Sequence, residues 1–226
     1  MIYLNGIPSS DVGLIVEHRP TRPIPKRKTL SWEIPGRSGK LIKTLDAWES
    51  ITLTYELALV PPPGVTLSDA TDAAVAWLMQ ADQMKLFDDA DPAVYYRVIY
   101  TGGDELTAIL HRARRVKARF TADPQRWLMT GTLATSLTAS GMKITNPTPH
   151  LAKPYVVIYG SGAGSLTFGS RVMNFNECSG LALDSESCSA SLPAFGNWPE
   201  LPSGDTVVSW TGGVTGIDVV PRWYVI

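Results

Sequence analysis

Apolar and polar residues alternate along much of the sequence, and this pattern predicts a mainly β protein. In residues 51–59, ITLTYELAL, every odd-numbered position is Ile, Leu or Tyr, whereas the even-numbered positions are Thr, Glu or Ala. A period of two is typical of a strand that buries one of its faces. Further strands are expected in the segments VYYRVIYTG, RRVKARF, KPYVVIYGSG, GSLTFGS and DTVVSWTGG.

One helix is expected over residues 67–81, after the stiff segment VPPPGV. Its apolar residues recur at the i, i+3, i+4 and i+7 spacing of one helical face. Thr66 or Ser68 is suited to cap its N-terminus, and Asp69 and Asp72 would lie near the positive end of its dipole. The face expected to be buried comprises Ala70, Ala73, Ala74, Trp77, Leu78 and Ala81.

Two Gly-containing segments look like phosphate-binding loops but lack the required spacing. IPGRSGKL (34–41) has Ile34 where a P-loop needs its first Gly, and Leu41 where it needs Ser or Thr. GSGAGS (160–165) lacks the third Gly of a dinucleotide-binding motif, since Thr167 stands three positions after Gly164, and a strand-like sequence follows. Both segments are therefore predicted to be tight turns, in which Gly supplies positive φ.

A change in composition near residue 140 predicts two domains. The chain has 226 residues and a formal net charge of −1. Residues 1–140 contain sixteen Lys and Arg and fifteen Asp and Glu, whereas the remainder contains four and six and is rich in Gly, Ser and Pro. The expected domains are 1–138, β with one helix, and 146–226, a small all-β sandwich, joined by a linker at 139–145.

The sequence offers no set of residues for catalysis, a cofactor or a metal ion, so no enzyme is expected. None of the three His residues lies near a nucleophile elbow or a metal-type neighbour. Asp88, Asp89 and Asp91 lack the spacing of an EF-hand loop, and a solvated loop is the preferred interpretation. Cys178 and Cys188 could pair across a hairpin, although two reduced thiols are favoured because there is no secretion signal.

Charge and hydropathy exclude two further classes of protein. A near-zero net charge disfavours a dedicated nucleic-acid binder, which would usually be basic. No apolar run approaches the length of a membrane span, so we expect a soluble protein without membrane insertion.

Two basic segments are candidates for an interface. EHRPTRPIPKRKTLSW (17–32) contains three Pro residues that keep it extended, so an arm or long hairpin is expected. HRARRVKARF (111–120) predicts a strand with a basic outer face, and a phase slip at Arg114–Arg115 suggests a β-bulge. That face could be solvated, or could contact a protein or passing nucleic acid; the neutral net charge favours the protein over the nucleic acid. The candidate residues are Arg22, Lys26 and Arg27 in the first segment and Arg115, Lys117 and Arg119 in the second.

Five motifs, in order along nearly the whole chain, resemble those of the distal tail protein (Dit) family of long-tailed phages. IPGRSGKL resembles the N-terminal signature, with Ser38 in place of the usual Asp. RFTADPQRW resembles the segment that closes the N-terminal domain, and NPTPHLAKPYVVIYGSGAGSLTFGS resembles the opening of the C-terminal domain. LALDSES and NWPELPSGDTVVSWTGG resemble two later motifs, although Asp205 replaces the more usual Asn. The residues that match the first motif, and are interface candidates, are Pro35, Gly36, Arg37 and Gly39.

The resemblance implies a structural virion protein without a cofactor, located at the distal end of the phage tail. It implies an N-terminal tail-tube-like β-sandwich with one α-helix and a long hairpin or arm, which forms a hexameric ring, and a C-terminal galectin-like β-sandwich. Such a ring is the hub that joins the tail tube to the tail tip or baseplate and the host-recognition apparatus. The implied partners are further copies of the chain in a homohexamer or stacked rings, the tail-tube protein, the tail-tip fibre or lysin hub protein, and a receptor-binding protein. DNA would only pass through the lumen, and assembly would take place in the host bacterial cytoplasm.

Three other functions are compatible with parts of the sequence. A carbohydrate-binding module of the tail tip would use exposed aromatic rings, for which Trp198 and Trp210 are candidates, with Trp223 and Tyr224 as further aromatics. A tail-tube subunit would share the N-terminal fold but would not need a second domain. A tail-attached hydrolase has no candidate nucleophile or acid pair in the sequence.

Overall fold

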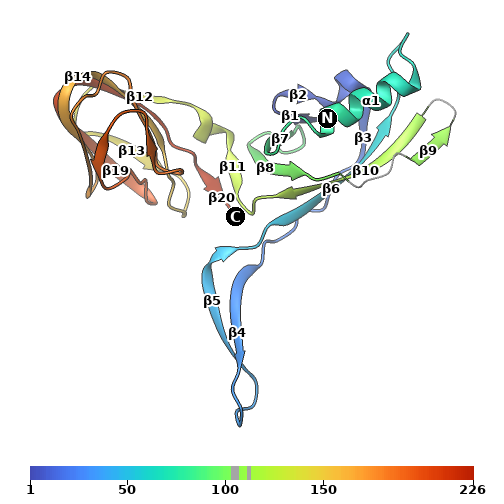
Figure 1. Ribbon diagram of the computed structural model, residues 1–226, viewed down its shortest axis with the longest axis horizontal. Coiled ribbons are helices and arrows are strands. Elements are labelled where there is room, and N and C mark those ends of the chain that lie inside the picture. The colour runs from blue at the N-terminus through green and yellow to red at the C-terminus, as the bar shows by residue number, and fades with distance from the viewer. Residues whose placement is uncertain (103–106, 111–112) are drawn as a thin grey trace. The chain divides into compact units, whose positions relative to one another are not determined.

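The computed structural model describes residues 1–102, 107–110 and 113–226, and for residues 107–110 it describes the backbone alone. The fold is mainly β, as predicted (Figure 1). The chain divides into two compact units, Met1–Arg126 together with Ile226, and Trp127–Val225. His111 and Arg112, which begin the second basic segment, lie outside the described residues.

The first unit is built on an antiparallel sheet with one face covered by a helix. Its strands pair in the order β2-β1-β7-β8-β10-β6-β3, with β9 beside β10. A short 3-10 helix, Ser9–Val12, joins β2 to β3. The strands are β1 (Ile2–Leu4), β2 (Ile7–Pro8), β3 (Leu14–His18), β6 (Ile51–Leu59), β7 (Met84–Asp88), β8 (Val94–Tyr100), β9 (Thr107–Leu110) and β10 (Ala113–Ala122).

The core of the first unit follows from the alternation in β6 and β10. Every odd-numbered residue of β6 is buried, as the sequence predicted. The register places Tyr55 opposite Ala118 and Leu53 opposite Phe120, so the apolar faces of the two strands coincide. Paired apolar side chains on one sheet face are the main stabilising contacts of such a core.

The helix α1 (Leu67–Leu78) packs its apolar stripe onto this core. Thr66 caps it, because its side-chain oxygen accepts a 3.2 Å hydrogen bond from the Asp69 N–H. The helix ends three residues before the predicted position, at Leu78. Of the residues expected to be buried, Ala73 and Ala81 are exposed. The four that are buried are Ala70, Ala74, Trp77 and Leu78.

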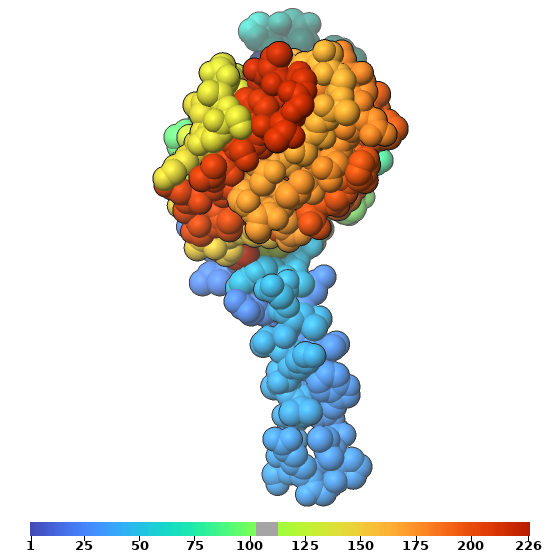
Figure 2. Space-filling view, turned by 90° about the vertical axis from the view of Figure 1, so that its left-hand side faces the viewer, coloured from blue at the N-terminus to red at the C-terminus, as the bar shows by residue number. Residues whose placement is uncertain are grey.

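A hairpin projects from the first unit between β3 and β6. It consists of β4 (Arg27–Glu33) and β5 (Lys40–Trp48), which pair only with each other among the described strands. Figure 2 shows it as a narrow projection. This hairpin confirms the long arm expected from the Pro-rich basic segment. We call residues 22–48 the arm.

The second unit is a curled antiparallel sheet around its own core. Its strands pair in the order β12-β19-β14-β15-β18, with β13 on β19, β16 on β14 and β17 on β16. Buried residues alternate at both ends of β14, where Val156 and Ile158 precede Leu166 and Phe168. The elements are β11 (Arg126–Leu128), a 3-10 helix (Met129–Thr132), β12 (Thr135–Leu137), β13 (Met142–Asn146), β14 (Tyr155–Phe168), β15 (Arg171–Phe175), β16 (Leu181–Asp184), β17 (Ser189–Ala190), β18 (Ala194–Gly196), β19 (Gly204–Val220) and β20 (Tyr224–Val225).

The GSGAGS segment is not a turn between two strands. It lies within the single strand β14, which pairs with β19 on both sides of register shifts at Gly160 and Gly164. A Cβ added at Gly160 would lie 2.1 Å from the Gly213 carbonyl oxygen. The glycines therefore permit close approach of two backbones at a bulge rather than a reversal of the chain.

The division between the units lies earlier than the composition suggested. It falls after Arg126, and the segment 139–145, expected to be a linker, contains most of β13. In β12 and β13, Leu137 pairs with Ile217 and Ile144 with Thr206, so both strands belong to the second sheet. The change in composition near residue 140 is a change in the number of charged residues. Charged residues lie mostly on the surface, so their number does not determine which sheet a strand joins.

Candidate assembly surfaces

The tip of the arm is a tight turn, as the sequence predicted. The Arg37 N–H donates a 3.1 Å hydrogen bond to the Ile34 carbonyl, which closes a four-residue turn with Pro35 second and Gly36 third. Gly36 has a φ of 83°, as the third position of a type II turn requires. The turn is followed by a second positive-φ residue, Gly39, before β5 begins.

One face of the arm carries an exposed apolar stripe. In the register of β4 and β5, Trp32 lies opposite Leu41 and Leu30 lies opposite Lys43, so these four side chains share a face. Trp32 is 45% exposed, and Leu30 and Leu41 are exposed to a similar degree. On the other face Ile42 lies opposite Ser31. An isolated two-stranded ribbon is only marginally stable in water, so this stripe is a candidate for burial against another chain.

The arm is also strongly basic. Between residues 22 and 48 there are seven Lys and Arg and two acidic residues. The Arg27 guanidinium lies over the Trp48 ring at 4.8 Å, and Lys40 pairs with Glu33 at 3.0 Å. Within the described part of the chain no acidic group lies within ion-pair distance of Arg22, Lys26 or Arg37.

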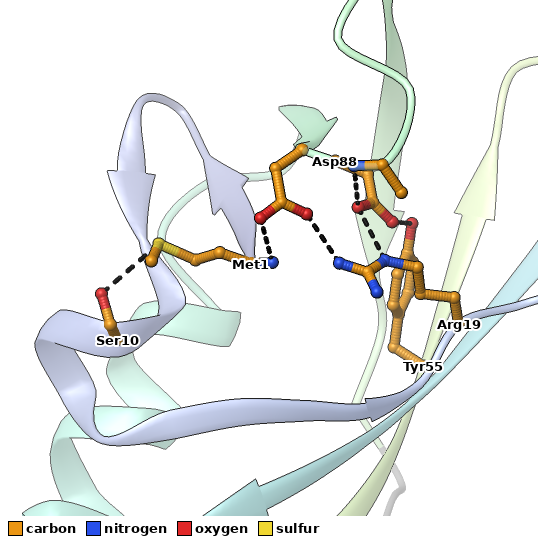
Figure 3. A network of polar contacts seen from close by, with 7 residues as sticks. Met1, Ser10, Arg19, Tyr55 and Asp88 are labelled. Atoms are coloured by element: carbon orange, nitrogen blue, oxygen red, sulfur yellow. Dashed lines mark hydrogen bonds and ion pairs between the residues drawn. The ribbon is translucent and has the colours of Figure 1, made fainter.

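A network of charged groups holds the chain where it leaves β3 toward the arm. The Arg19 guanidinium donates to Asp88 at 3.0 Å and to Asp89 at 2.6 Å (Figure 3). The Tyr55 hydroxyl donates to Asp88 at 3.0 Å, and the Met1 amino group donates to Asp89 at 2.6 Å. The sequence analysis did not predict these contacts, because Asp88 lies 69 positions from Arg19 along the chain.

The pKa shifts in this network reflect burial and charge. Burial, reinforced by the Asp88 carboxylate, strongly raises the pKa of Tyr55. The Met1 amino group, followed by the Arg19 guanidinium, lowers the pKa of Asp89. The solvated-loop interpretation is therefore wrong for Asp88, whose side chain is 16% exposed. Asp91 also has a partner, since the Arg126 guanidinium donates to it.

The basic face of β10 is partly neutralised within its own sheet. The Arg115 guanidinium makes a two-point contact with the Glu17 carboxylate, and Lys117 Nζ lies 2.8 Å from Glu56. Arg115 lowers the pKa of Glu17, and Lys117 lowers that of Glu56. The predicted bulge occurs one residue earlier than expected, between Ala113 and Arg114, in the pairing with β9. Arg119 also has an interaction. This face is therefore less free than the arm to bind a partner.

The two Trp residues considered for sugar binding do not lie in one pocket. Trp198 lines an open hollow of about 460 Å³ together with Cys188, Ser191 and Leu192. The Ser191 hydroxyl already accepts a hydrogen bond from the Ala182 N–H. Trp210 does not line this hollow; it lies on β19 opposite Leu166. Trp223 is buried, and Tyr224 stacks on His150.

Within the described residues there is no group of three or more His, Cys, Asp or Glu that could hold a metal ion. No helix in that part of the chain is both long and apolar enough to cross a membrane. Both cysteines are free thiols; Cys178 is buried, which raises its pKa, and Cys188 is exposed.

The arrangement of the elements matches a solved structure over the entire chain. The crystal structure of the phage SPP1 Dit protein, described as a paradigm of the hub adsorption apparatus in phages that infect Gram-positive bacteria, aligns with a TM-score of 0.67. The alignment covers 100% of this chain and 98% of that chain, at 14% sequence identity. This chain has the fold of the SPP1 Dit protein.

Two phage p2 baseplate structures, in activated conformations with strontium and with calcium, align more weakly. Their TM-scores are 0.49 and 0.47 at 7% identity, with 92% of this chain and 90% of each of those chains covered. At TM-scores below 0.5, these two likenesses do not establish a shared fold. No protein-family model matches the sequence, and no curated protein matches it. The likeness to the SPP1 Dit protein therefore establishes the fold, and the roles of individual residues have to be argued from their own geometry.

Proposed function

We propose that this chain is a distal tail protein, a structural virion component that forms a hexameric hub ring between the phage tail tube and the tail tip or baseplate. The observation that carries the proposal is the likeness to the SPP1 Dit protein across both units, from end to end of the chain. A tail-tube subunit would explain the first unit alone. The second unit, which is covered by the same likeness, favours the hub.

In this ring, the arm of each copy contacts the neighbouring copy. Its exposed stripe of Leu30, Trp32 and Leu41 supports this role, because these side chains are not buried within the chain. Arg22, Lys26 and Arg27 and the turn residues Pro35, Gly36, Arg37 and Gly39 form the proposed interface, with Arg115, Lys117 and Arg119 as further contributors. An arm and an acceptor on different surfaces give a heterologous contact, which closes into a ring when repeated.

The ring has no enzymatic role in this proposal and takes no cofactor. Its partners are the tail-tube protein, the tail-tip fibre or lysin hub protein and a receptor-binding protein, with DNA passing through the lumen. Rings assemble in the host bacterial cytoplasm and reside at the distal end of the tail in the virion. Carbohydrate binding is less well supported, because the hollow beside Trp198 is lined mainly by apolar and small side chains.

The molar mass in solution, measured by light scattering and combined with negative-stain images, tests the proposal. Six chains of 24.5 kDa would give about 147 kDa, and rings with a central hole should be visible. If the protein alone is a monomer, the measurement is repeated with the tail-tube protein added. A single-chain mass in both experiments would contradict the hub function.

A further inference from the structure

The outer face of α1 is unusual for the surface of a helix. Its central stripe consists of Ser68, Asp72, Val75 and Met79, which are all exposed and spaced by four, three and four residues. Met79 is 57% exposed and Val75 is 39% exposed. A solvated helix face normally carries many charged side chains, whereas this stripe carries one, Asp72. The face therefore has the character of a surface that another segment covers.

The helix and the residues that flank it are acidic, whereas the arm is basic. From Thr66 to Asp82 the sequence contains three Asp residues and no Lys or Arg. The arm contains an excess of five basic residues over acidic ones, seven against two. The two surfaces also match in apolar character, since each has a narrow exposed apolar stripe. Complementary charge around an apolar stripe is the pattern of a specific protein interface.

We infer that the arm of one copy docks across the outer face of α1 in the next copy. The inference deepens the proposed function and rests on it, because it requires a ring of identical copies. Val75 and Met79 are exposed, and so is Trp32, so the arm does not cover the helix within one chain. Each copy supplies one arm and one helix, so in a closed ring every arm has a helix to bind and every helix is covered by an arm.

In this contact Trp32 and Leu41 pack against Val75 and Met79, and Lys43 lies near Asp72. Lys43 shares the arm face with Trp32 and Leu41, as the strand register requires. Ala73 and Ala76 are small exposed neighbours of the stripe, and their size allows a flat ribbon to approach the helix closely.

Reversed charges on the two surfaces provide the first test. We expect Leu30→Glu with Lys43→Glu on the arm, and separately Asp72→Lys with Val75→Lys on the helix, each to weaken ring formation at least about tenfold. One chain that carries all four substitutions should recover much of the loss, because opposite charges again face each other. The matched control is Thr29→Glu with Thr44→Glu, a directly opposed pair on the other face of the arm. It should have little effect on ring formation.

A photo-crosslinker in place of Trp32 provides a second readout in the otherwise native full-length protein. Light and isotopically heavy copies are mixed, assembled with the tail-tube protein and irradiated, and the linked peptides are identified by mass spectrometry. Links between a light and a heavy copy should join position 32 to residues 66–82. A normal ring whose links lie elsewhere would overturn the docking site while leaving the hub function intact. If the protein with Trp32 intact also fails to associate with further copies, even with the tail-tube protein present, both the hub function and the docking site are wrong.

Discussion

The Tyr55 hydroxyl donates a 3.0 Å hydrogen bond to Asp88, and through that carboxylate it is linked to Arg19 at the end of β3. Tyr55 is one of the buried residues of β6, so the network connects the core to the segment that leads into the arm. The position of the chain where it enters the arm thus depends on the core of the first unit.

Replacing Tyr55 with Phe should lower the free energy of unfolding of the first unit by about 2 kcal/mol, because a hydrogen bond from a buried hydroxyl to a partly buried carboxylate is lost. Denaturant unfolding followed by a probe in the first unit measures this change. Tyr159→Phe, followed by a probe in the second unit, is the matched control, since Tyr159 is exposed and donates a 2.8 Å hydrogen bond to the carboxylate of Asp218. Its effect should remain within about 0.5 kcal/mol. Equal effects of the two substitutions would show that burial of the Tyr55–Asp88 hydrogen bond does not add to its contribution to stability.

The second unit should lose stability in acid through Asp184. The Arg222 guanidinium binds both oxygens of Asp184, at 2.6 and 3.0 Å, and holds the pKa of this carboxyl below its usual range. A carboxyl whose folded pKa is depressed stabilises the fold fully at pH values above its unfolded pKa of about 3.9, and this stabilisation is lost as the pH falls through the folded pKa.

Thermal unfolding at several pH values checks this expectation. The stability difference between the natural protein and Asp184→Asn should be largest at neutral pH and should shrink below about pH 4. Asp46→Asn, an exposed position on the arm, serves as the control and should leave the second unit unchanged. A difference that does not depend on pH would indicate that Asp184 acts through packing alone.

The arm turn should be sensitive to Gly36→Ala. A Cβ at this position would have no atom within 4 Å, so the cost arises from the positive φ alone and should be about 1 kcal/mol. Hydrogen exchange of the arm amides should accelerate, while the melting temperatures of the two units should not change, because the turn contributes to neither core. Ser38→Ala in the same turn region is the control. Unchanged exchange in Gly36→Ala would show that the turn tolerates a side chain.

In the proposed ring, Arg37→Ala should weaken ring formation and reduce its dependence on salt. The guanidinium lies on the exposed tip of the arm and can donate to carboxylates or carbonyls of the neighbouring copy. Analytical ultracentrifugation at low and high ionic strength measures both effects. An unchanged ring with unchanged salt dependence would remove Arg37 from the interface.

The two thiols should react at very different rates. Cys188 is exposed and should be alkylated promptly, whereas Cys178 is fully buried and its thiol has a raised pKa. Mass spectrometry after brief treatment with iodoacetamide should therefore find one modified site, and denaturation should expose the second. Resistance of both thiols that is relieved by a reducing agent would instead point to a disulfide.

Local patterns in the sequence predicted those structural features that depend only on neighbouring residues. The alternation in β6, the turn at Gly36 and the N-cap, for which Thr66 was one of two candidates, are all determined within a few positions of the chain. Each of these features was correctly predicted, because period, capping and turn chemistry act locally.

Features that depend on distant strands were not predictable in this way. The glycines of β14 gave the same local signal as a turn, and only pairing with β19, about fifty residues later, makes them a bulge. The partners of Asp88 were missed for the same reason. The alternation of Leu30 and Trp32 within the basic arm was a local signal that could have indicated the exposed stripe.

Within the described residues, no residue of β4 or β5 belongs to the core cluster of either unit. In the proposed ring, mutations in these strands should alter recognition between copies without a large cost in folding, whereas mutations in β6 or β10 should also disturb the core. If the proposed hub function holds, the arm can diverge quickly between related phages on an unchanged scaffold. Two such proteins in one infected cell would then assemble into separate rings, because each arm would fit only the surface of its own kind.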